Sequence, residues 1–195
     1  MSHTIMNRID AMRIILDHLP NEPVIANCGA TSRELASIHR SAQHLYILDS
    51  MGIASSVGLG LALALAESAA KRVVVLEGDG ALLMNLTSLA SIAYHQPHKL
   101  LLVVLDNESY ASTGGQATYT QRVNLGDMAE AAGLATLRAT DEVELEATLS
   151  QLDDIDGPVF LHVKIAAGNA PDIPLLLEDP AVIAHEFAAW VKTLI

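Results

Sequence analysis

The sequence predicts an α/β fold, a three-layer, doubly wound, mostly parallel sheet with helices on both faces. Residues 73–76 and 100–105 are continuous aliphatic runs, the pattern of strands buried on both faces of a parallel sheet. Strand-like and helix-like segments also alternate regularly along the chain, which is typical of parallel strands joined by helices. With 195 residues, we expect one domain spanning residues 1–195, in which residues 170–195 form a C-terminal arm and helix.

The first half of the chain is predicted to alternate between helices and short strands. The first helix is amphipathic and ends before Pro20, because proline cannot continue a helix. The second helix follows a strand-to-helix turn, where a hydroxyl can cap it. In order, the expected elements are helix 4–18, strand 24–26, a helix capped by Thr31 or Ser32, strand 46–48 and helix 53–66.

The second half continues the alternation to the end of the chain. The terminal helix has an apolar face that includes Trp190, which predicts docking on its own domain or on a neighbour. In order, the expected elements are strand 73–76, one helix, strand 100–105, loop 108–118, helix 125–132, strand 134–137, helix 141–151, strand 159–165 and a helix from about residue 181.

Charge and cysteine content exclude several function classes. The formal net charge of −12 at pH 7 excludes a nucleic-acid backbone or an anionic membrane as the main partner. The single cysteine, Cys28, excludes an internal disulfide and an iron–sulfur cluster held only by this chain's cysteines. The apolar stretch 53–66 is too short to span a bilayer, and the charged first helix is no signal sequence. We therefore expect a cytoplasmic protein.

Chemistry-bearing residues follow two neighbouring strands. Residues 73–76 lead into Gly78-Asp79-Gly80, where the glycines let the backbone turn sharply and approach a ligand, and a following helix start offers free N–H groups. Residues 100–105 lead into Asp106 and Asn107. Consecutive parallel strands end at the same edge of a sheet, so these groups are expected to meet. Carboxylate and amide oxygens suit Mg²⁺, and the motif therefore predicts a metal-diphosphate site.

Two further segments are candidates for ligand contact. Residues 27–35 form a strand-to-helix turn in which Arg33 and the helix start could receive an anionic substrate group, with an ordinary turn as the alternative. Residues 108–118, rich in hydroxyls and glycines, are interpreted as a mobile cover, with an ordinary polar loop as the alternative. Cys28 is interpreted as a small buried residue, because no histidine adjoins it to activate the thiol.

The combined motif is similar to that of a known cofactor family. Asn107 follows Asp79 by 28 positions, and each stands at the end of a strand. This arrangement resembles the thiamine diphosphate motif of the decarboxylase and acetolactate synthase superfamily, in its diphosphate-binding domain. The resemblance implies that Asp79 and Asn107 bind Mg²⁺ through side-chain oxygens, and Ser109 through its backbone carbonyl. It also implies that the diphosphate meets backbone N–H groups of Gly78, Gly80 and Ala81, although many relatives carry serine in place of Ala81.

The same resemblance extends the expected cofactor site beyond the metal. Met51 falls where the family places a bulky apolar residue that holds the two cofactor rings in a bent form. The carbonyl of Asp49 would accept a hydrogen bond from the aminopyrimidine. Further residues that the resemblance assigns to cofactor binding are Ser50, Tyr110 and Ala111.

A narrower resemblance concerns the substrate. Residues 29–35 and 112–116 look like phosphonopyruvate decarboxylase and the β subunit of sulfopyruvate decarboxylase. These enzymes remove CO₂ from a small 2-oxo acid that bears a second strong anion. The resemblance therefore implies a small anionic 2-oxo acid as substrate, with Arg33, Ser112 and Thr113 as candidates for binding it.

The glutamate that activates the cofactor in this family has no counterpart in the chain. In the family it comes from a separate pyrimidine-binding domain, and this chain has room for one α/β domain. We therefore expect a hetero-oligomer in which a pyrimidine-binding α subunit supplies the glutamate, so this chain offers no catalytic residue of that kind. This expectation favours the two-subunit sulfopyruvate decarboxylase over the single-chain phosphonopyruvate enzyme.

Other functions stay open at this point. The β subunit of a 2-oxoacid:ferredoxin oxidoreductase shares the Gly-Asp-Gly site, although such subunits often carry several cysteines. A non-catalytic subunit that binds thiamine diphosphate is a second alternative. A nicotinamide-binding Rossmann domain is disfavoured, because no Gly-x-Gly-x-x-Gly follows the first strand.

Overall fold

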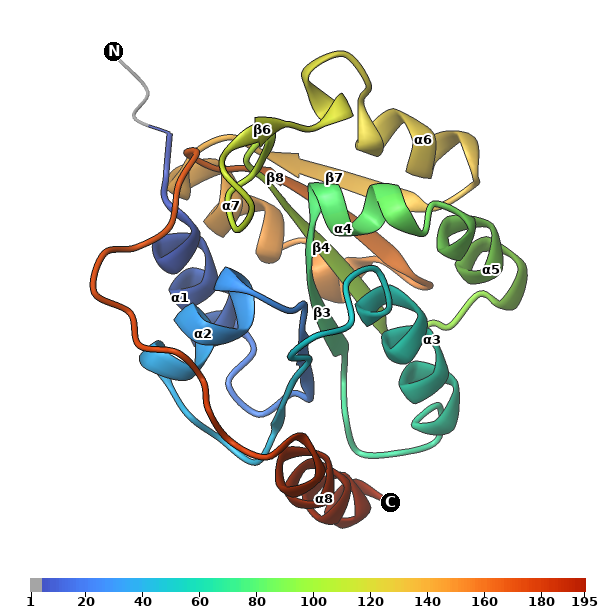
Figure 1. The fold of residues 1–195 in the computed structure, drawn as a ribbon. Helices are drawn as coiled ribbons and strands as arrows, with labels where there is room; N and C mark the ends of the chain where they lie inside the picture. Colours follow the sequence, from blue (N-terminus) through green and yellow to red (C-terminus); the bar gives the residue numbers. More distant parts are fainter. Residues whose placement is uncertain (1–4) are drawn as a thin grey trace.

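The computed structural model describes residues 5–195, which form a six-stranded sheet between two layers of helices (Figure 1). The strand order is β2-β1-β3-β4-β8-β7, and every neighbouring pair is parallel. The predicted three-layer, doubly wound fold is confirmed. Its strands are β1 (Val24–Ala26), β2 (His44–Tyr46), β3 (Val73–Gly78), β4 (Leu100–Asp106), β7 (Ala135–Ala139) and β8 (Val159–Lys164).

Helices cover both faces of this sheet. The face that carries α1, α2 and α7 lies opposite the face that carries α3, α5 and α6 (Figure 1). The bounds of the helices are α1 (Arg8–His18), α2 (Ala30–Ile38), α3 (Ala54–Ala64), α4 (Asp79–Met84), α5 (Thr87–His95), α6 (Leu125–Ala131), α7 (Glu142–Leu149) and α8 (Pro180–Val191).

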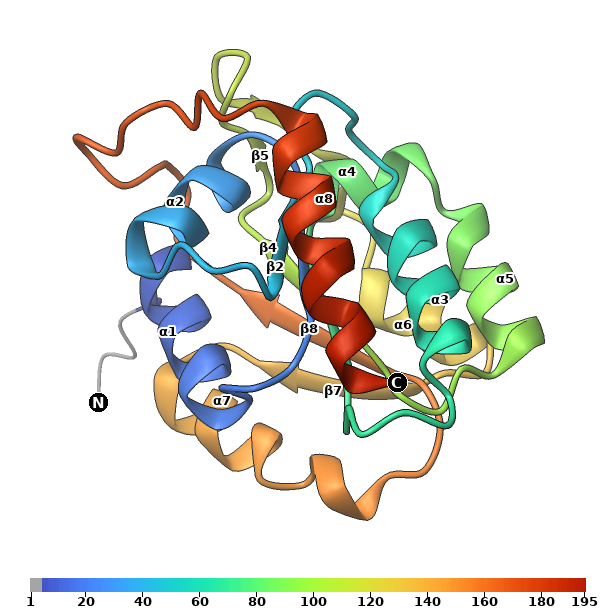
Figure 2. The same ribbon diagram turned by 90° about the horizontal axis from the view of Figure 1, so that it is seen from below.

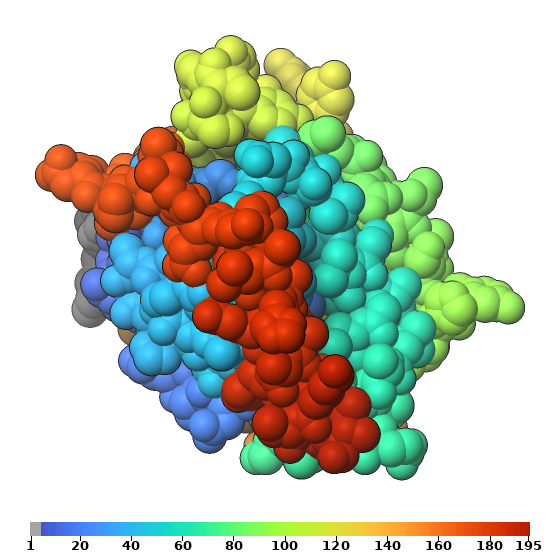
Figure 3. All heavy atoms as spheres, turned by 60° about the horizontal axis from the view of Figure 1, so that its bottom comes forward, coloured from blue at the N-terminus to red at the C-terminus, as the bar shows by residue number. Residues whose placement is uncertain are grey.

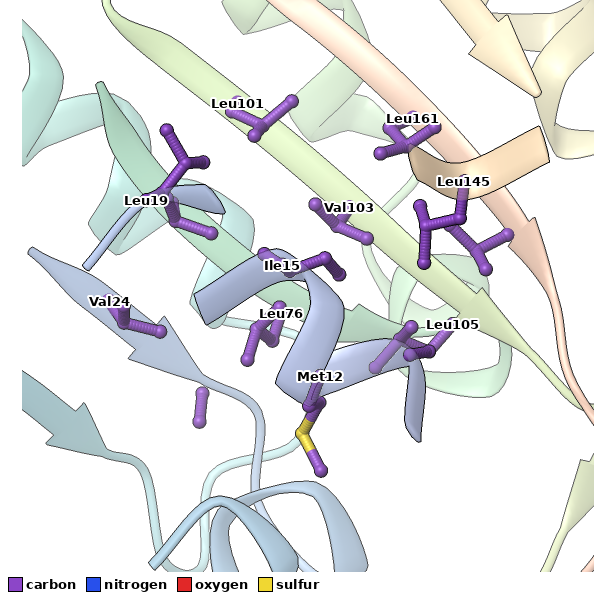
Figure 4. Close-up of a cluster of buried hydrophobic side chains, with 14 of the residues drawn as sticks. Met12, Ile15, Leu19, Val24, Leu76, Leu101, Val103, Leu105, Leu145 and Leu161 are labelled. Carbon is purple, nitrogen blue, oxygen red and sulfur yellow. The ribbon is translucent and has the colours of Figure 1, made fainter. Parts of the chain in front are cut away.

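The central strands send alternate side chains to the two faces. Leu76 and Val103 belong to the hydrophobic cluster on the α1 face, whereas their neighbours along β3 and β4 belong to the cluster on the other face. Figure 4 shows Met12 and Ile15 of α1 packed over these strands. Because both faces are buried, β3 and β4 contain continuous aliphatic runs without polar alternation.

The chain leaves the neighbouring strands β1 and β3 toward opposite faces. α2 follows β1 and packs Leu35 into the α1 cluster, while α5 follows β3 and packs Leu89 and Ile92 into the opposite one. In open α/β sheets a ligand crevice lies outside the carboxyl ends of strands at such a switch point. The fold thus places the segments after β1 and β3 around one crevice.

Local contacts shift several predicted boundaries. Asn7 caps α1 by accepting the backbone N–H of Asp10, and the expected start at Thr4 lies outside the described residues. The single helix expected after β3 is divided into α4 and α5 at Asn85, whose side chain donates to the carbonyl of Gly52 at 2.9 Å. The expected loop 108–118 contains a short antiparallel pair, β5 (Ser109–Tyr110) and β6 (Gln116–Ala117).

The C-terminal arm returns across the surface of the molecule (Figure 3) and ends in α8, which lies over β2 (Figure 2). Ile183 and Phe187 of this helix are buried, whereas Trp190 is only partly covered. Arg40 adds ion pairs to Glu178 and Glu186 at the side of the contact. The arm therefore docks on its own domain and covers the edge strand of the sheet.

Candidate active site

A cavity of about 90 Å³ lies at the carboxyl ends of β1, β3 and β4. Its wall comes from residues 27–31 after β1, from Met51, from residues 78–81 after β3 and from the segment after β4, with Arg8 and Asn169 completing it. Small-molecule sites usually enclose about 300–1,000 Å³. This chain therefore encloses part of a cofactor-sized ligand and leaves the remainder open.

Asp79 stands in this wall as the first residue of α4, and its side chain is 3% exposed. Burial raises the pKa of Asp79, and the nearby charge of Asp106 adds to the increase. Hydrogen bonds from the Thr118 and Thr120 hydroxyls, 2.5 and 3.2 Å from Oδ2, act in the opposite direction. No cationic side chain is among the groups that shift this pKa. A bound cation would supply the missing positive charge.

Asn107 and Ser109 reach the same cavity from the end of β4. The Asn107 amide oxygen accepts the backbone N–H of Ser109 at 3.1 Å. Glu108, between them, has a left-handed φ of 57°, which turns the chain sharply at this point. Asp79 and Asn107 therefore offer a carboxylate and an amide oxygen to one cavity, the ligand type that a hard cation prefers.

Among residues 5–195, no three histidine, cysteine, aspartate or glutamate side chains converge as ligands for a metal ion. A cation in the cavity would therefore also need amide, backbone or ligand oxygens, as magnesium sites next to phosphates commonly do.

Gly80 makes room for the cavity wall. A Cβ built on Gly80 would lie 2.3 Å from the Tyr110 ring, far inside van der Waals contact. Only glycine allows Tyr110 to lie against the start of α4. The backbone can then approach a ligand closely, which is the use predicted for the glycines of this motif.

Glu77, directly before the Gly-Asp-Gly motif, supports the segment that carries Met51. Its Oε2 accepts the backbone N–H of Ser55 at 3.1 Å, and burial raises the pKa of Glu77 to about 7. From the other side, Asn85 donates to the carbonyl of Gly52. Sequence reasoning missed Glu77, because an isolated acid at the end of an aliphatic strand shows no periodic pattern.

The predicted cofactor residues divide into two groups. Asp49 and Ser50 are exposed and are not among the residues of the cavity wall, and the contact expected of the Asp49 carbonyl stays a prediction. Those that line the cavity are Met51, Gly78, Asp79, Gly80, Ala81, Asn107, Ser109, Tyr110 and Ala111.

The predicted substrate residues also divide. Ser112 lines the cavity, but Thr113 does not, and its hydroxyl bonds to the Gln116 side chain. Arg33 lies outside the wall because its guanidinium donates to the carbonyls of Ile173 and Pro174 in the C-terminal arm. The expectation that Arg33 faces the site is therefore corrected: this side chain holds the arm.

Several wall residues were not predicted individually. Residues 27–31 belong to the strand-to-helix turn 27–35, whose sequence indicates possible ligand contact for the segment but does not single out its residues. Asn27 is 5% exposed, and its Oδ1 is buried without a hydrogen-bond partner, an unusual state for a polar atom. Arg8 and Asn169 reach the cavity from both ends of the chain, and no local sequence signal marks them.

Comparison with known sequences identifies the family. Residues 27–163 match the family described as "Thiamine pyrophosphate enzyme, C-terminal TPP binding domain". The chain belongs to this family. The matched range contains every predicted cofactor residue that lines the cavity. Among residues 5–195, no helix is long and apolar enough to cross a membrane.

Individual members of the thiamine pyrophosphate family are similar over most of the chain. Sulfopyruvate decarboxylase subunit beta of Methanothermobacter thermautotrophicus is 46% identical over 187 residues, covering 96% of both chains. Phosphonopyruvate decarboxylase of Streptomyces viridochromogenes is 37% identical, covering 95% of this chain and 46% of that protein. Benzoylformate decarboxylase from Polynucleobacter necessarius has a TM-score of 0.72 at 16% identity, covering 82% of this chain and 33% of that one. This last likeness shows the fold alone.

Proposed function

We propose that this chain is the β subunit of a thiamine diphosphate- and Mg²⁺-dependent 2-oxo acid decarboxylase that converts sulfopyruvate to sulfoacetaldehyde and CO₂. A pyrimidine-binding α subunit completes the active site and carries the activating glutamate. The observation that carries the proposal is the cavity itself, where Asp79, Asn107 and Met51 meet around a glycine-lined wall. Family membership supports the cofactor, and the 46% identical relative supports the reaction.

The small size of the cavity supports a shared site. Its volume of about 90 Å³ is smaller than that of a usual cofactor pocket. The chain also covers 96% of a relative that is named as a beta subunit. A second, pyrimidine-binding subunit would account for both facts by closing the open side of the cavity.

Each cavity residue has a distinct task in this proposal. Asp79 and Asn107 would hold Mg²⁺ with their side-chain oxygens, and Ser109 with its backbone carbonyl. The ion would balance the charge of the diphosphate. Gly78, Gly80 and Ala81 would present backbone N–H groups to the phosphate oxygens. Met51 supports the bent form of the cofactor, and Glu77 holds the Met51 segment in place. When bound, thiamine diphosphate supplies the nucleophilic carbon and the electron sink that decarboxylation needs.

The hairpin formed by β5 and β6 supplies the cover. Ser109, Tyr110 and Ser112 line the cavity, while Thr118 at the other end of the hairpin donates to Asp79. A cation bound at Asp79 would therefore affect the position of the hairpin through the hydrogen bond from Thr118. A closed hairpin excludes water from the reacting carbon.

Reconstitution tests the proposal directly. The chain is purified alone and together with a co-expressed pyrimidine-domain α subunit, and CO₂ release is measured with sulfopyruvate, phosphonopyruvate and pyruvate in the presence of thiamine diphosphate and Mg²⁺. We expect release only from the complex, with sulfopyruvate preferred. Turnover by the isolated chain would refute the shared site. A preference for phosphonopyruvate would refute sulfopyruvate as the substrate. A complex that binds the cofactor without turnover would identify a non-catalytic subunit.

A further inference from the structure

Arg8 is a buried cation in the wall of the cofactor cavity. It is the first residue of α1 and is 8% exposed. The same side chain also lines a second cavity of about 430 Å³ between α1, α2 and residues 166–173. Asn169 is shared by the two cavities in the same way. The guanidinium of Arg8 therefore forms part of the partition between them.

Contacts from two distant segments hold this guanidinium. Nη1 donates to Glu34 Oε1 at 2.9 Å and to Asn169 Oδ1 at 3.3 Å, and Nη2 donates to the carbonyl of Gly168 at 3.3 Å. Within residues 5–195, Nε has no hydrogen-bond acceptor. The guanidinium plane is thus fixed while part of its donor capacity is still available.

The ion pair between Arg8 and Glu34 lacks some of the hydrogen bonds that a purely stabilising buried pair needs. Glu34 is 2% exposed, and its Oε1 accepts both Arg8 and the backbone N–H of Ala170, while its Oε2 is buried without a partner. Removing two charges from water carries a large desolvation cost, which only a complete set of hydrogen bonds recovers. An incomplete pair at the wall of a ligand cavity indicates that the arginine has a use besides stability.

We infer that Arg8 binds an oxyanion in the cavity, and that Glu34 is a positioning residue that sets the plane of the guanidinium. This inference rests on the proposed function, in which the cavity receives the phosphates of the cofactor and a doubly anionic substrate. A guanidinium matches the oxygens of a phosphate or a sulfonate with paired donors. Arg8 takes the role expected from the sequence for Arg33, whose Nε and Nη2 donate to carbonyls of the arm.

The test uses the complete complex with its α subunit and three variants of this chain. Arg8→Lys retains the charge but loses the planar fork, and the double variant Arg8→Gln/Glu34→Gln removes both charges together, so that neither is left unpaired. Arg13→Gln is the matched control, because Arg13 lies on the same helix, does not line the cofactor cavity and is 59% exposed. Thermal unfolding is recorded for each variant to establish folding.

Two measurements separate the sources of the oxyanion. Calorimetry with thiamine diphosphate and Mg²⁺ reports the cofactor phosphates, and kcat/KM for sulfopyruvate relative to pyruvate reports the substrate sulfonate. We expect one of these quantities to fall about 10- to 100-fold in the double variant, the range for losing a hydrogen bond to a charged group, and to fall less in Arg8→Lys. Arg13→Gln should stay within about twofold of wild type, because its charge is largely solvated.

Each outcome decides a different question. A fall in cofactor affinity assigns Arg8 to phosphate, and a fall confined to the sulfopyruvate preference assigns it to the sulfonate. Unchanged values for both in a folded Arg8→Lys complex overturn the inference, even if the double variant does not fold. Failure of the wild-type complex to bind thiamine diphosphate would instead refute the proposed function.

Discussion

Asp79 and Asp106 stand at the ends of adjacent strands, are almost equally buried, and have opposite electrostatic environments. Burial alone would raise both pKa values, and it raises that of Asp79. Asp106 instead accepts hydrogen bonds from His162 and Lys164 at 2.8 and 3.1 Å, which lower its pKa to about 2. Thr120 bonds to both carboxylates.

This difference indicates which carboxylate can serve a ligand. Asp106 already has a cationic partner inside the protein, Lys164 of β8. Asp106 therefore stabilises the pairing of β4 with β8. Asp79 has only hydroxyl and backbone donors, so an added cation would gain most there. Two acids from one sheet edge are thereby separated into a structural residue and a candidate metal ligand.

The largest effect is expected for Asp79→Asn. The substitution removes the carboxylate but retains the shape, so we expect kcat/KM of the complex to fall about a thousandfold, equivalent to about 4 kcal/mol. The unliganded chain should be as stable as wild type or slightly more stable, because the raised pKa shows that the buried charge is unfavourable. Calorimetry and urea unfolding measure the two effects. A marked loss of stability with full cofactor binding would reverse the assignment of roles.

The converse result is expected for Asp106→Asn. This change removes the carboxylate that His162 and Lys164 contact, and only Lys164 keeps a second acidic partner, Glu108. We expect the free energy of unfolding to fall by about 3 kcal/mol. Cofactor affinity should change much less than in Asp79→Asn when both are compared by calorimetry. An unchanged urea midpoint would show that the Asp106 network is not a stabilising one.

His44, in β2, shows how burial alone makes stability depend on pH at a site other than the two aspartates. Burial lowers the pKa of His44 to about 4, although its hydrogen bond to the His39 carbonyl acts in the opposite direction. His44 is therefore neutral when folded and gains a proton on unfolding below about pH 6.5. Stability should therefore fall by about 2 kcal/mol from pH 7 to pH 5. Urea unfolding of wild type and His44→Gln across this range measures the effect. If the free energy of unfolding changes equally with pH in wild type and in His44→Gln, the pH dependence comes from other groups.

The smallest effect is expected for Lys164→Gln. Lys164 is 33% exposed and pairs with both Asp106 and Glu108, so solvent screens much of its contribution. We expect a loss of about 1 kcal/mol or less, a higher pKa for Asp106 and cofactor affinity within about twofold of wild type. NMR titration of the Asp106 carboxyl and calorimetry measure these changes. A tenfold loss of cofactor affinity would mean that Asp106 and Asp79 act as one unit.

Local patterns were sufficient for the central part of the molecule. Runs of aliphatic residues predicted β3 and β4, and the parallel order of these strands predicted that Asp79 and Asn107 lie at one edge of the sheet, where both line the cavity. These predictions succeed because a parallel strand buried on both faces has a distinctive composition, and because neighbouring parallel strands end at one edge. Periodicity did not predict the break between α4 and α5, since the contact of Asn85 with Gly52 joins separate segments.

The sequence by itself determined the α/β class, the two central strands and the motif that identifies the cofactor family. Only the tertiary structure decided that Arg8 faces the cavity while Arg33 holds the arm, and that Asp79 lacks partners such as the Lys164 and His162 that contact Asp106. These roles depend on which distant segments converge: Arg8 meets residues 160 positions away, and Asp106 meets Lys164 across 58. A side chain's charge environment is set by neighbours in space, and local sequence carries only the neighbours along the chain.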